Sequence, residues 1–552
     1  MNAPLPRPVA FETSTDSFEL SPGAPVAGPT DLAGAVRLAL SVLDLRPAGA
    51  GEAGAVTVEH DAALGHEAYT LEVTGRGVRI AAGDRQGAFY AGQTLRQLLP
   101  DAAFRAAPVE AGGEGWTVPG VTVRDAPRLA WRGAHLDLAR HFLPKREVLR
   151  MIDLMAVHKL NRLHLHLVDD QGWRVESRAY PRLHEVGSHR PRTIVGHHED
   201  APVYDEVPHG GYYTLDDLAE ISGYARARAV TVVPEIDVPG HACAILAAYP
   251  ELDARATGGR TPEPFTVLDR WGISTAILSP LPSTVDFLTV VIDEILGALG
   301  ETPYVHIGGD ECVLDDWAAS PEIAAFQAEL GLENVGDLHA WFLRRLADVL
   351  AERGSRAVVW DEAFVSGMLR PDTIVMPWRG PGVAQRAAQA GHDVVQTSVF
   401  PLYFDYAEAA SEEEPLAIGE TITVGDVVAY EPVPSSWTDA QREHVIGAQF
   451  QLWSERLPDA RALDYRAWPR GCALAEVAWS GTPGADFDAR LERHLRRLDA
   501  LGVEYRPLSG PRPWQLGGAG PRRHRPGFVN AEDVMKRLEG MTHDADSTRP
   551  SM

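Results

Sequence analysis

The sequence predicts an α/β protein, a (β/α)₈ TIM barrel preceded by a small α+β domain, and three observations support this. The chain has 552 residues, too many for one ordinary domain but suitable for a barrel with an accessory domain. Hydrophobic residues make up 45% of it, enough for a large buried core. From Trp131 onward, short β-rich segments alternate with longer helical ones. We therefore expect domains at residues 1–125, 126–508 and 509–552.

The first predicted domain combines strands with a helix. Residues 68–83 alternate apolar and polar side chains around a Gly-rich turn, which predicts a β-hairpin. Residues 85–99 then place Ala88, Ala91 and Leu95 on one face of a predicted helix. Strands followed by a helix indicate a small α+β domain.

Eight candidate strands, with helices between most of them, meet the requirement of a (β/α)₈ barrel. Helices are predicted over residues 145–158 and 337–352, where apolar side chains recur with helical spacing. A doubly wound open sheet is the alternative, but no Gly-rich phosphate turn follows the first strand. The strands are expected at residues 133–139, 161–168, 229–236, 303–309, 356–362, 373–378, 393–398 and 446–453.

Composition restricts the class of function. The formal net charge of −26 argues against nucleic-acid binding, which needs a basic surface. The three cysteines provide neither a disulfide framework nor the spacing of a metal cluster. The N-terminus lacks a secretory signal pattern, and no apolar window of about 18 residues appears, so we expect a soluble, cytoplasmic protein with no membrane partner. Residues 509–552 are rich in Pro, Gly and Arg and are expected to be extended or partly disordered.

Acids and tryptophans gather at the predicted carboxyl ends of the strands, where barrel enzymes place their active sites. Aromatic faces stack on sugar rings and carboxylates bind hydroxyls, so a pocket with both suits a carbohydrate. One such tryptophan is more often part of the core, and one such acid is often a helix cap. Four tryptophans at different strand ends favour a site, and they are Trp173, Trp360, Trp378 and Trp453.

The stretch YVHIGGDECV, residues 304–313, places two acids side by side after an apolar run. Its two glycines let the backbone turn sharply and approach a ligand. Adjacent side chains leave a strand in different directions, so Asp310 and Glu311 can address two parts of one substrate. One negative charge raises the pKa of a neighbouring carboxyl, and a glycosidase needs a proton donor near neutral pH. We therefore expect a catalytic pair rather than a solvated acidic turn.

The segment HIGGDE, His306 to Glu311, resembles the H-x-G-G-D-E signature of glycoside hydrolase family 20, the β-N-acetylhexosaminidases. The likeness extends over about residues 125–508, and residues 1–125 are similar to the small α/β domain that often precedes this barrel. Six further segments resemble blocks of the family, in the family's order: residues 131–144, 158–174, 234–242, 360–362, 403–405 and 453–455.

The resemblance implies a retaining exo-β-N-acetylhexosaminidase that removes terminal, non-reducing β-linked GlcNAc or GalNAc. In this family the substrate's own 2-acetamido oxygen attacks the anomeric carbon and forms an oxazolinium ion. Asp310 would orient the acetamido group and stabilise the positive charge. Glu311 would protonate the leaving oxygen and then deprotonate water. The only partner implied is a small carbohydrate, and neither a cofactor nor a metal is required.

The resemblance also implies the supporting residues, one at a time. Tyr403 would hydrogen-bond the acetamido oxygen, and Arg132 would bind the 3- and 4-hydroxyls with its planar fork. Asp169 and His241 would form a relay to Glu311 that tunes its proton affinity. The pocket walls would be Trp360, Trp378 and Trp453, the ligands of the 4- and 6-hydroxyls Asp405 and Glu455, and the structural supports His166 and His306.

Two other functions stay open at this point. A metal-dependent amidohydrolase barrel could use the pair His164 and His166 at a strand end, although the acids and tryptophans would then be unexplained. A sugar-binding barrel without catalysis is the other, although the acid pair and Tyr403 are all present. Residues 187–211 contain clustered histidines, and we expect a polar loop at the rim because metal-ligand spacing is lacking.

Overall fold

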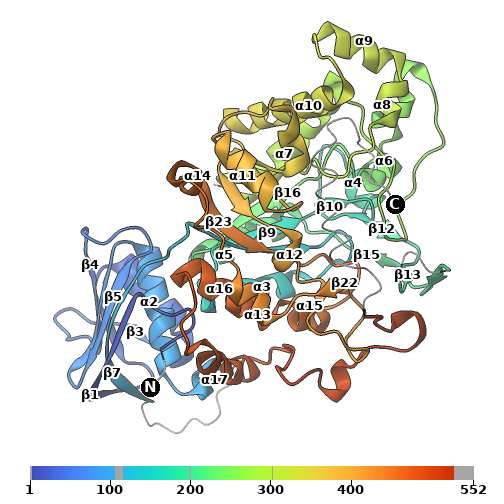
Figure 1. The fold of residues 1–552 in the computed structure, drawn as a ribbon. Coiled ribbons are helices and arrows are strands. Elements are labelled where there is room, and N and C mark those ends of the chain that lie inside the picture. Colours follow the sequence, from blue (N-terminus) through green and yellow to red (C-terminus); the bar gives the residue numbers. More distant parts are fainter. Residues whose placement is uncertain (1–2, 106–115, 198–200, 301, 527–552) are drawn as a thin grey trace.

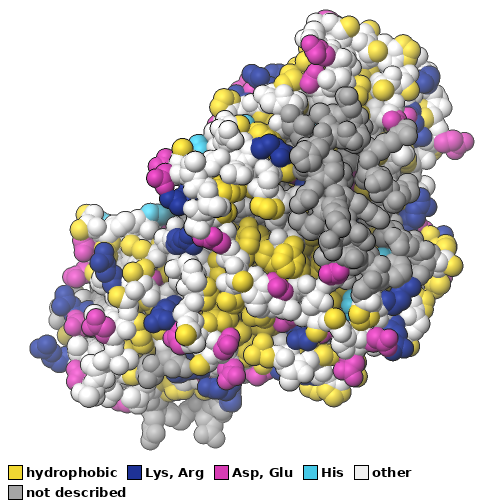
Figure 2. All heavy atoms as spheres, viewed as in Figure 1, with side chains coloured by type: hydrophobic (Ala, Val, Ile, Leu, Met, Phe, Trp, Pro, Cys, Tyr) yellow, Lys and Arg dark blue, Asp and Glu magenta, His cyan; other side chains and the backbone are white. Residues whose placement is uncertain are grey.

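The computed structural model of the chain describes residues 3–105, 116–197, 201–300 and 302–526. Figure 1 shows two parts side by side, a sheet with helices formed by the N-terminal residues and a larger barrel. Acidic and basic side chains are interspersed over the face drawn in Figure 2. Among the described residues, no helix combines the length and apolar character needed to span a bilayer.

The N-terminal part is a seven-stranded sheet in the order β1-β7-β5-β6-β4-β2-β3, packed against helices α1 (Thr30–Ala39) and α2 (Arg85–Leu98). The predicted hairpin is present as β5 and β6, which pair antiparallel. Helix α2 begins after Asp84, whose side chain accepts a hydrogen bond from the Gly87 amide and so caps it. The strands are β1 (Ala10–Leu20), β2 (Pro25–Ala27), β3 (Arg46–Pro47), β4 (Val56–His60), β5 (Tyr69–Thr74), β6 (Gly77–Ala82) and β7 (Trp116–Asp125).

Eight parallel strands close into a barrel, which confirms the predicted fold and excludes the open-sheet alternative. Each predicted segment overlaps one barrel strand. β8 and β23 begin earlier than predicted, and every strand ends earlier because the last predicted residues belong to the following loop. These residues are the ones available for a site. The strands are β8 (Trp131–Asp137), β9 (Arg162–His166), β16 (Thr231–Glu235), β17 (Tyr304–His306), β18 (Arg356–Trp360), β19 (Ile374–Met376), β20 (Val394–Gln396) and β23 (Val445–Phe450).

Helices surround the barrel, and the two predicted from apolar spacing are present as α3 and α10. Helix α10 begins after Asn334, whose side chain accepts from the Asp337 amide, and it buries Leu338, Phe342 and Leu346. The longer barrel helices are α3 (Lys145–Val157), α5 (Leu215–Ala227), α7 (Pro282–Leu299), α10 (Val335–Glu352), α11 (Pro381–Gln389), α16 (Arg470–Ser480) and α17 (Phe487–Ala500).

Short elements form the loops at the carboxyl ends of the strands. In the His-rich segment 187–211, β12 (His189–Arg190) pairs with β15 (His209–Gly210), and β13 (Ile194–Val195) pairs with β14 (Val203–Tyr204). Near the C-terminus, residues 513–515 and 520–522 form short 3₁₀ turns, and the expected disorder of residues 527–552 lies outside the described residues. Other short elements are β10 (Val168–Asp169), β11 (Gly172–Trp173), α6 (Cys243–Ala248), α12 (Val399–Leu402), β21 (Tyr406–Ala407) and β22 (Ile418–Thr421).

The strand register aligns polar side chains at the carboxyl end of the barrel. Glu235 of β16 lies opposite both His306 of β17 and His166 of β9. His166 in turn lies opposite Asp137 of β8. These four polar side chains therefore occupy one layer of the barrel, directly below the loops.

Candidate active site

A cavity of about 190 Å³ lies at the carboxyl ends of the barrel strands. Asp310 and Glu311, from the loop after β17, line it together with Tyr403, which follows α12. Burial raises the pKa of the Tyr403 hydroxyl, so this group keeps its hydrogen and can donate it to a ligand. The structure thus brings the predicted acid pair and the predicted tyrosine to one cavity.

The turn that carries the acid pair depends on its two glycines. Gly308 and Gly309 have positive φ angles of 64° and 100°. A Cβ atom on Gly308 would lie 1.7 Å from a carboxylate oxygen of Asp237, and one on Gly309 would lie 2.6 Å from Leu343. The Gly309 amide donates to that same oxygen of Asp237 at 3.2 Å. Glu311 itself has a φ of 50°, a backbone conformation that costs a non-glycine residue energy.

Asp310 is 8% exposed, and its position explains its protonation behaviour. Burial and the charge of Asp237 raise the pKa of Asp310 well above its ordinary value, although His241 opposes the shift. Its Oδ1 atom is buried and has no hydrogen-bond partner among the described residues. An orphaned oxygen with high proton affinity is well suited to accept a hydrogen bond from a ligand.

Two tryptophans form walls of the cavity, and a third lies beneath. Trp378 and Trp453 line it, and the Trp453 ring is 6.2 Å from the Tyr403 ring. Trp360 is only 1% exposed, packs 5.9 Å from Trp453, and donates from its indole nitrogen to Glu235 at 2.8 Å. In this structure Trp360 supports the wall rather than lining it.

Asp405 and Glu455 meet at one side of the cavity, as predicted for residues that bind sugar hydroxyls. Burial and the charge of Glu455 raise the pKa of Asp405 to about 8. Burial also raises the pKa of Glu455, with Arg140 acting against it. One carboxylate oxygen of each residue is buried without a partner among the described residues, so both can accept from a ligand.

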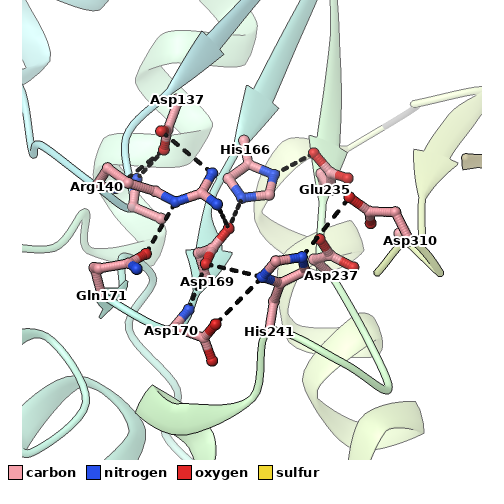
Figure 3. A network of polar contacts seen from close by, with 12 residues as sticks. Asp137, Arg140, His166, Asp169, Asp170, Gln171, Glu235, Asp237, His241 and Asp310 are labelled. Carbon is pink, nitrogen blue, oxygen red and sulfur yellow. Dashed lines mark hydrogen bonds and ion pairs between the residues drawn. The ribbon is translucent and has the colours of Figure 1, made fainter. Parts of the chain in front are cut away.

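The residues of the predicted relay, Asp169 and His241, lie side by side (Figure 3). Nδ1 of His241 lies 3.3 Å from Asp169 and 3.3 Å from Asp170. Nε2 lies 3.5 Å from Glu311 and 3.8 Å from Asp310. Burial would lower the pKa of His241, but Asp169 and the hydrogen bonds around the ring raise it well above its ordinary value.

The prediction that Arg132 binds the sugar is wrong. Arg132 stands at the amino end of β8, is 0% exposed, and makes a bidentate ion pair with Glu67 of the N-terminal domain at 2.8 and 3.0 Å. Arg140, three residues beyond the carboxyl end of the same strand, lines the cavity instead. It pairs with Asp169 at 2.9 Å and donates to Gln171 at 2.9 Å. Its place after the strand, on the active-site face, is the signal that could have identified it.

Further residues of the site escaped sequence analysis. Tyr406, Val399 and Ile418 line the cavity and carry no pattern that marks a site. Glu362 lies behind the wall, accepting from the Trp378 indole at 3.0 Å and from the Glu311 amide at 3.5 Å. It is the last residue of the predicted strand 356–362, two residues after Trp360, so its position in the sequence pointed towards the site.

The histidines considered for a metal site gather around one carboxylate. His164, His166 and His306 lie 3.1, 2.5 and 2.9 Å from Glu235, respectively, and all are fully buried. The rings of His164 and His306 stack at 4.7 Å. Their ligand atoms and those of Glu235 are close enough to surround an ion, although Glu235 also contacts all three rings directly. His166 and His306 therefore support the site from below.

Comparison with known families gives two matches. The sequence model for the catalytic domain of glycosyl hydrolase family 20 matches residues 129–482, and the model for domain 2 of the same family matches residues 4–126. Together the two matches cover most of the chain and meet at the linker between sheet and barrel.

Individual relatives agree with the family matches. The chain is 35% identical to a β-hexosaminidase of Porphyromonas gingivalis, over 99% of this chain and 69% of the relative. A solved exo-β-N-acetylglucosaminidase of Vibrio harveyi, in complex with N-acetylglucosamine, has a TM-score of 0.79 and 31% identity, covering 91% of this chain and 78% of that one. A Streptomyces plicatus N-acetyl-β-hexosaminidase has a TM-score of 0.76 and 30% identity over 92% and 97% of the chains.

Proposed function

The chain belongs to glycosyl hydrolase family 20, and we propose that it is a retaining exo-β-N-acetylhexosaminidase that uses substrate-assisted catalysis. It is a glycoside hydrolase of the β-hexosaminidase type. The proposed substrate is a glycan with a terminal, non-reducing β-linked GlcNAc or GalNAc. The Vibrio harveyi relative, solved with N-acetylglucosamine, supports this choice of sugar.

One observation carries the proposal. Asp310, Asp405 and Glu455 line the same small cavity as two tryptophans, and each has a buried carboxylate oxygen without a partner among the described residues. Unpaired buried acceptors are costly, so the site is built for a ligand that donates several hydrogen bonds and has an apolar face. An N-acetylated sugar has both, because it carries hydroxyls, an amide N–H and a ring face.

The first chemical step forms the intermediate. The acetamido oxygen of the substrate attacks the anomeric carbon, and the bond to the leaving oxygen breaks while Glu311 gives that oxygen its proton. Asp310 accepts the acetamido N–H and stabilises the positive charge of the oxazolinium ring. Tyr403 donates its hydroxyl hydrogen to the acetamido oxygen and so holds that oxygen in line for attack.

The second step releases the sugar. Glu311, now ionised, takes a proton from water as that water attacks the anomeric carbon. The bond between this carbon and the acetamido oxygen breaks, which restores the acetamido group. Two successive inversions retain the β configuration. Asp405 and Glu455 close one side of the cavity at the proposed 4- and 6-hydroxyls, which supports release of single terminal sugars.

The test uses 4-nitrophenyl β-glycosides of GlcNAc, GalNAc and glucose, with and without a thiazoline analogue of the oxazolinium ion. We expect cleavage of the acetamido sugars only, inhibition by the thiazoline, and no effect of a chelator. Proton NMR should show the β anomer as the first product. Cleavage of the glucoside at a comparable rate, or release of the α anomer first, would contradict the mechanism.

Variants of the acid pair test the assigned roles. Asp310→Asn and Glu311→Gln should each lower kcat by about 100-fold or more, because each removes a group that acts in the transition state. Thermal unfolding should change little, since both side chains face the cavity. Wild-type rates in either variant would refute the role given to that residue.

A further inference from the structure

We propose that His166 is a positioning residue for proton transfer by Glu311, linking the buried carboxylate of Glu235 to the relay of Asp169 and His241. The inference deepens the proposed function and rests on it. Figure 3 shows the side chains of Glu235, His166, Asp169 and His241 in succession, with Asp310 beside His241.

The barrel register places the first two members side by side. Glu235 and His166 are direct partners at the carboxyl ends of the parallel strands β16 and β9. Asp169 is three residues beyond His166, in the short strand β10. The relay therefore begins in the rigid part of the barrel, where backbone pairing fixes the side chains more firmly than a loop can.

His166 is held by a carboxylate at each ring nitrogen. Nδ1 lies 2.5 Å from Glu235 and Nε2 lies 2.7 Å from Asp169. Burial would lower the pKa of His166, but the charges of Glu235 and Asp169 raise it well above its ordinary value. Both nitrogens therefore carry hydrogens, and the ring is an imidazolium that cannot rotate without losing a charge-assisted hydrogen bond.

His166 contacts one carboxylate oxygen of Asp169, and His241 of the relay lies near the other. Oδ2 of Asp169 lies 2.7 Å from His166 and 2.9 Å from Arg140. Oδ1 accepts from the Asp170 amide at 2.6 Å and lies 3.3 Å from Nδ1 of His241. Burial would raise the pKa of Asp169, but Arg140, His241 and His166 hold it well below its ordinary value. The carboxylate thus stays ionised and correctly turned towards His241.

Glu235 anchors the far end of the network. Its two oxygens lie 2.5 to 3.1 Å from three histidines and accept from the Trp360 indole at 2.8 Å. Trp360 packs under Trp453, so the same carboxylate supports a wall of the cavity and the relay. Removal of His166 should leave Asp169 with only Arg140 and the Asp170 amide to hold it, and so make its contact with His241 less firm.

His164 provides a matched control. It stands on the same strand, is equally buried, and lies 3.1 Å from the same Glu235 carboxylate. No contact between His164 and Asp169 is present among the described residues. A substitution at His164 therefore removes one contact in the barrel core but keeps the direct contacts of His166 with Glu235 and with Asp169.

The experiment compares leaving groups. The dinitrophenolate of 2,4-dinitrophenyl β-GlcNAc departs with little protonation, whereas phenyl β-GlcNAc requires the proton of Glu311. We expect His166→Gln to lower kcat/KM for the phenyl glycoside at least about tenfold more than for the dinitrophenyl glycoside. His164→Gln should lower both values by the same factor, because a structural defect does not distinguish leaving groups.

A second variant, Glu235→Gln, tests the proposal if the His166→Gln protein does not fold. Glu235→Gln keeps the shape of the side chain and removes the charge that holds the imidazolium, so it should show the same preference for the better leaving group. Equal losses of kcat/KM for both substrates in His166→Gln would overturn the proposal. If His166→Gln does not fold, equal losses in Glu235→Gln would overturn it. Wild-type protein inactive on both substrates would instead refute the proposed function.

Discussion

At the scale of the residue, the role of a side chain depends on whether it lies at the amino end or the carboxyl end of a barrel strand. Arg132 and Arg140 flank the same strand, β8, and both are buried arginines with acidic partners. The former faces the N-terminal domain and the latter faces the cavity. Family blocks alone placed the sugar-binding arginine at the wrong end, whereas the polarity of a barrel strand points to the other.

The two arginines should therefore respond differently to the same substitution. Arg140→Gln should lower kcat/KM by about 10- to 100-fold, because it removes a charged donor that lines the cavity and the ion pair with Asp169. Arg132→Gln should instead lower the free energy of unfolding by about 3–5 kcal/mol, because Glu67 is left buried and unpaired. The test measures kcat/KM and urea unfolding for both variants. A loss of stability in Arg140→Gln together with a loss of kcat/KM in Arg132→Gln would refute the assignment.

Asp405 should make stability depend on pH. Its pKa is about 8 in the folded protein and near the ordinary 3.8 when unfolded, so the folded state holds a proton that the unfolded state releases. This contribution is complete below pH 4 and is lost as pH rises towards 8, with a slope of up to about 1.4 kcal/mol per pH unit. Urea unfolding from about pH 5 to 7.5 should show a steeper decline in wild type than in Asp405→Asn. Parallel plots of the free energy of unfolding against pH for the two proteins would contradict this role of Asp405.

At the scale of the element, the turn after β17 is shaped by what packs around it. Gly308 is required because Asp237 occupies the space of a side chain, and the Gly309 amide is held by that same carboxylate. Asp237 comes from the loop after the neighbouring strand, β16. The catalytic turn is therefore built by two adjacent strand ends together, which is how a barrel combines residues distant in sequence.

Two glycines with similar φ angles allow the stability cost of backbone strain to be distinguished from the cost of a steric clash. Gly308 and Gly258 have φ angles of 64° and 68°, but Gly258 faces open space. Gly258→Ala should cost about 1 kcal/mol of stability, the penalty of a left-handed alanine. Gly308→Ala should cost about 3 kcal/mol or more and abolish most activity, since the turn must move. Similar stability losses in the two variants would show that Asp237 does not define the turn.

At the scale of the whole molecule, buried charges join the two domains. Lys159, at the end of α3, is 0% exposed and lies 2.7 Å from Asp125 at the end of β7. Tyr69 and Trp479 also donate to Asp125, at 2.6 and 2.9 Å. Burial lowers the pKa of Lys159, although Asp125 opposes the shift. Such an interface makes each domain depend on the other for its stability.

The interface should make the two domains unfold together. Asp125→Asn should lower the free energy of unfolding by about 3–5 kcal/mol, because Lys159 loses its buried counter-charge. Loss of activity and loss of circular dichroism should coincide in wild type during urea unfolding. Glu52→Gln, which breaks the exposed pair with Arg46, is the control and should change the midpoint little. Two separate wild-type transitions would show that the domains are independent.

The sequence by itself determined the fold, most of the cavity and the class of enzyme. The eight strands followed from short β-rich segments, because the period of buried side chains is a local property of the chain. Asp310, Glu311, Tyr403, Asp405 and others could be identified because they lie in loops after these strands and in segments that resemble blocks of the family.

Only the tertiary structure decided which partners the polar residues find. The separation of Arg132 from the cavity, the contact of His166 with Glu235, and the collision that fixes Gly308 all involve residues that are distant in sequence. Sequence patterns report which side of an element faces inward, but not the neighbour across the barrel. That neighbour is set by strand register and closure, which depend on the packing of the whole chain.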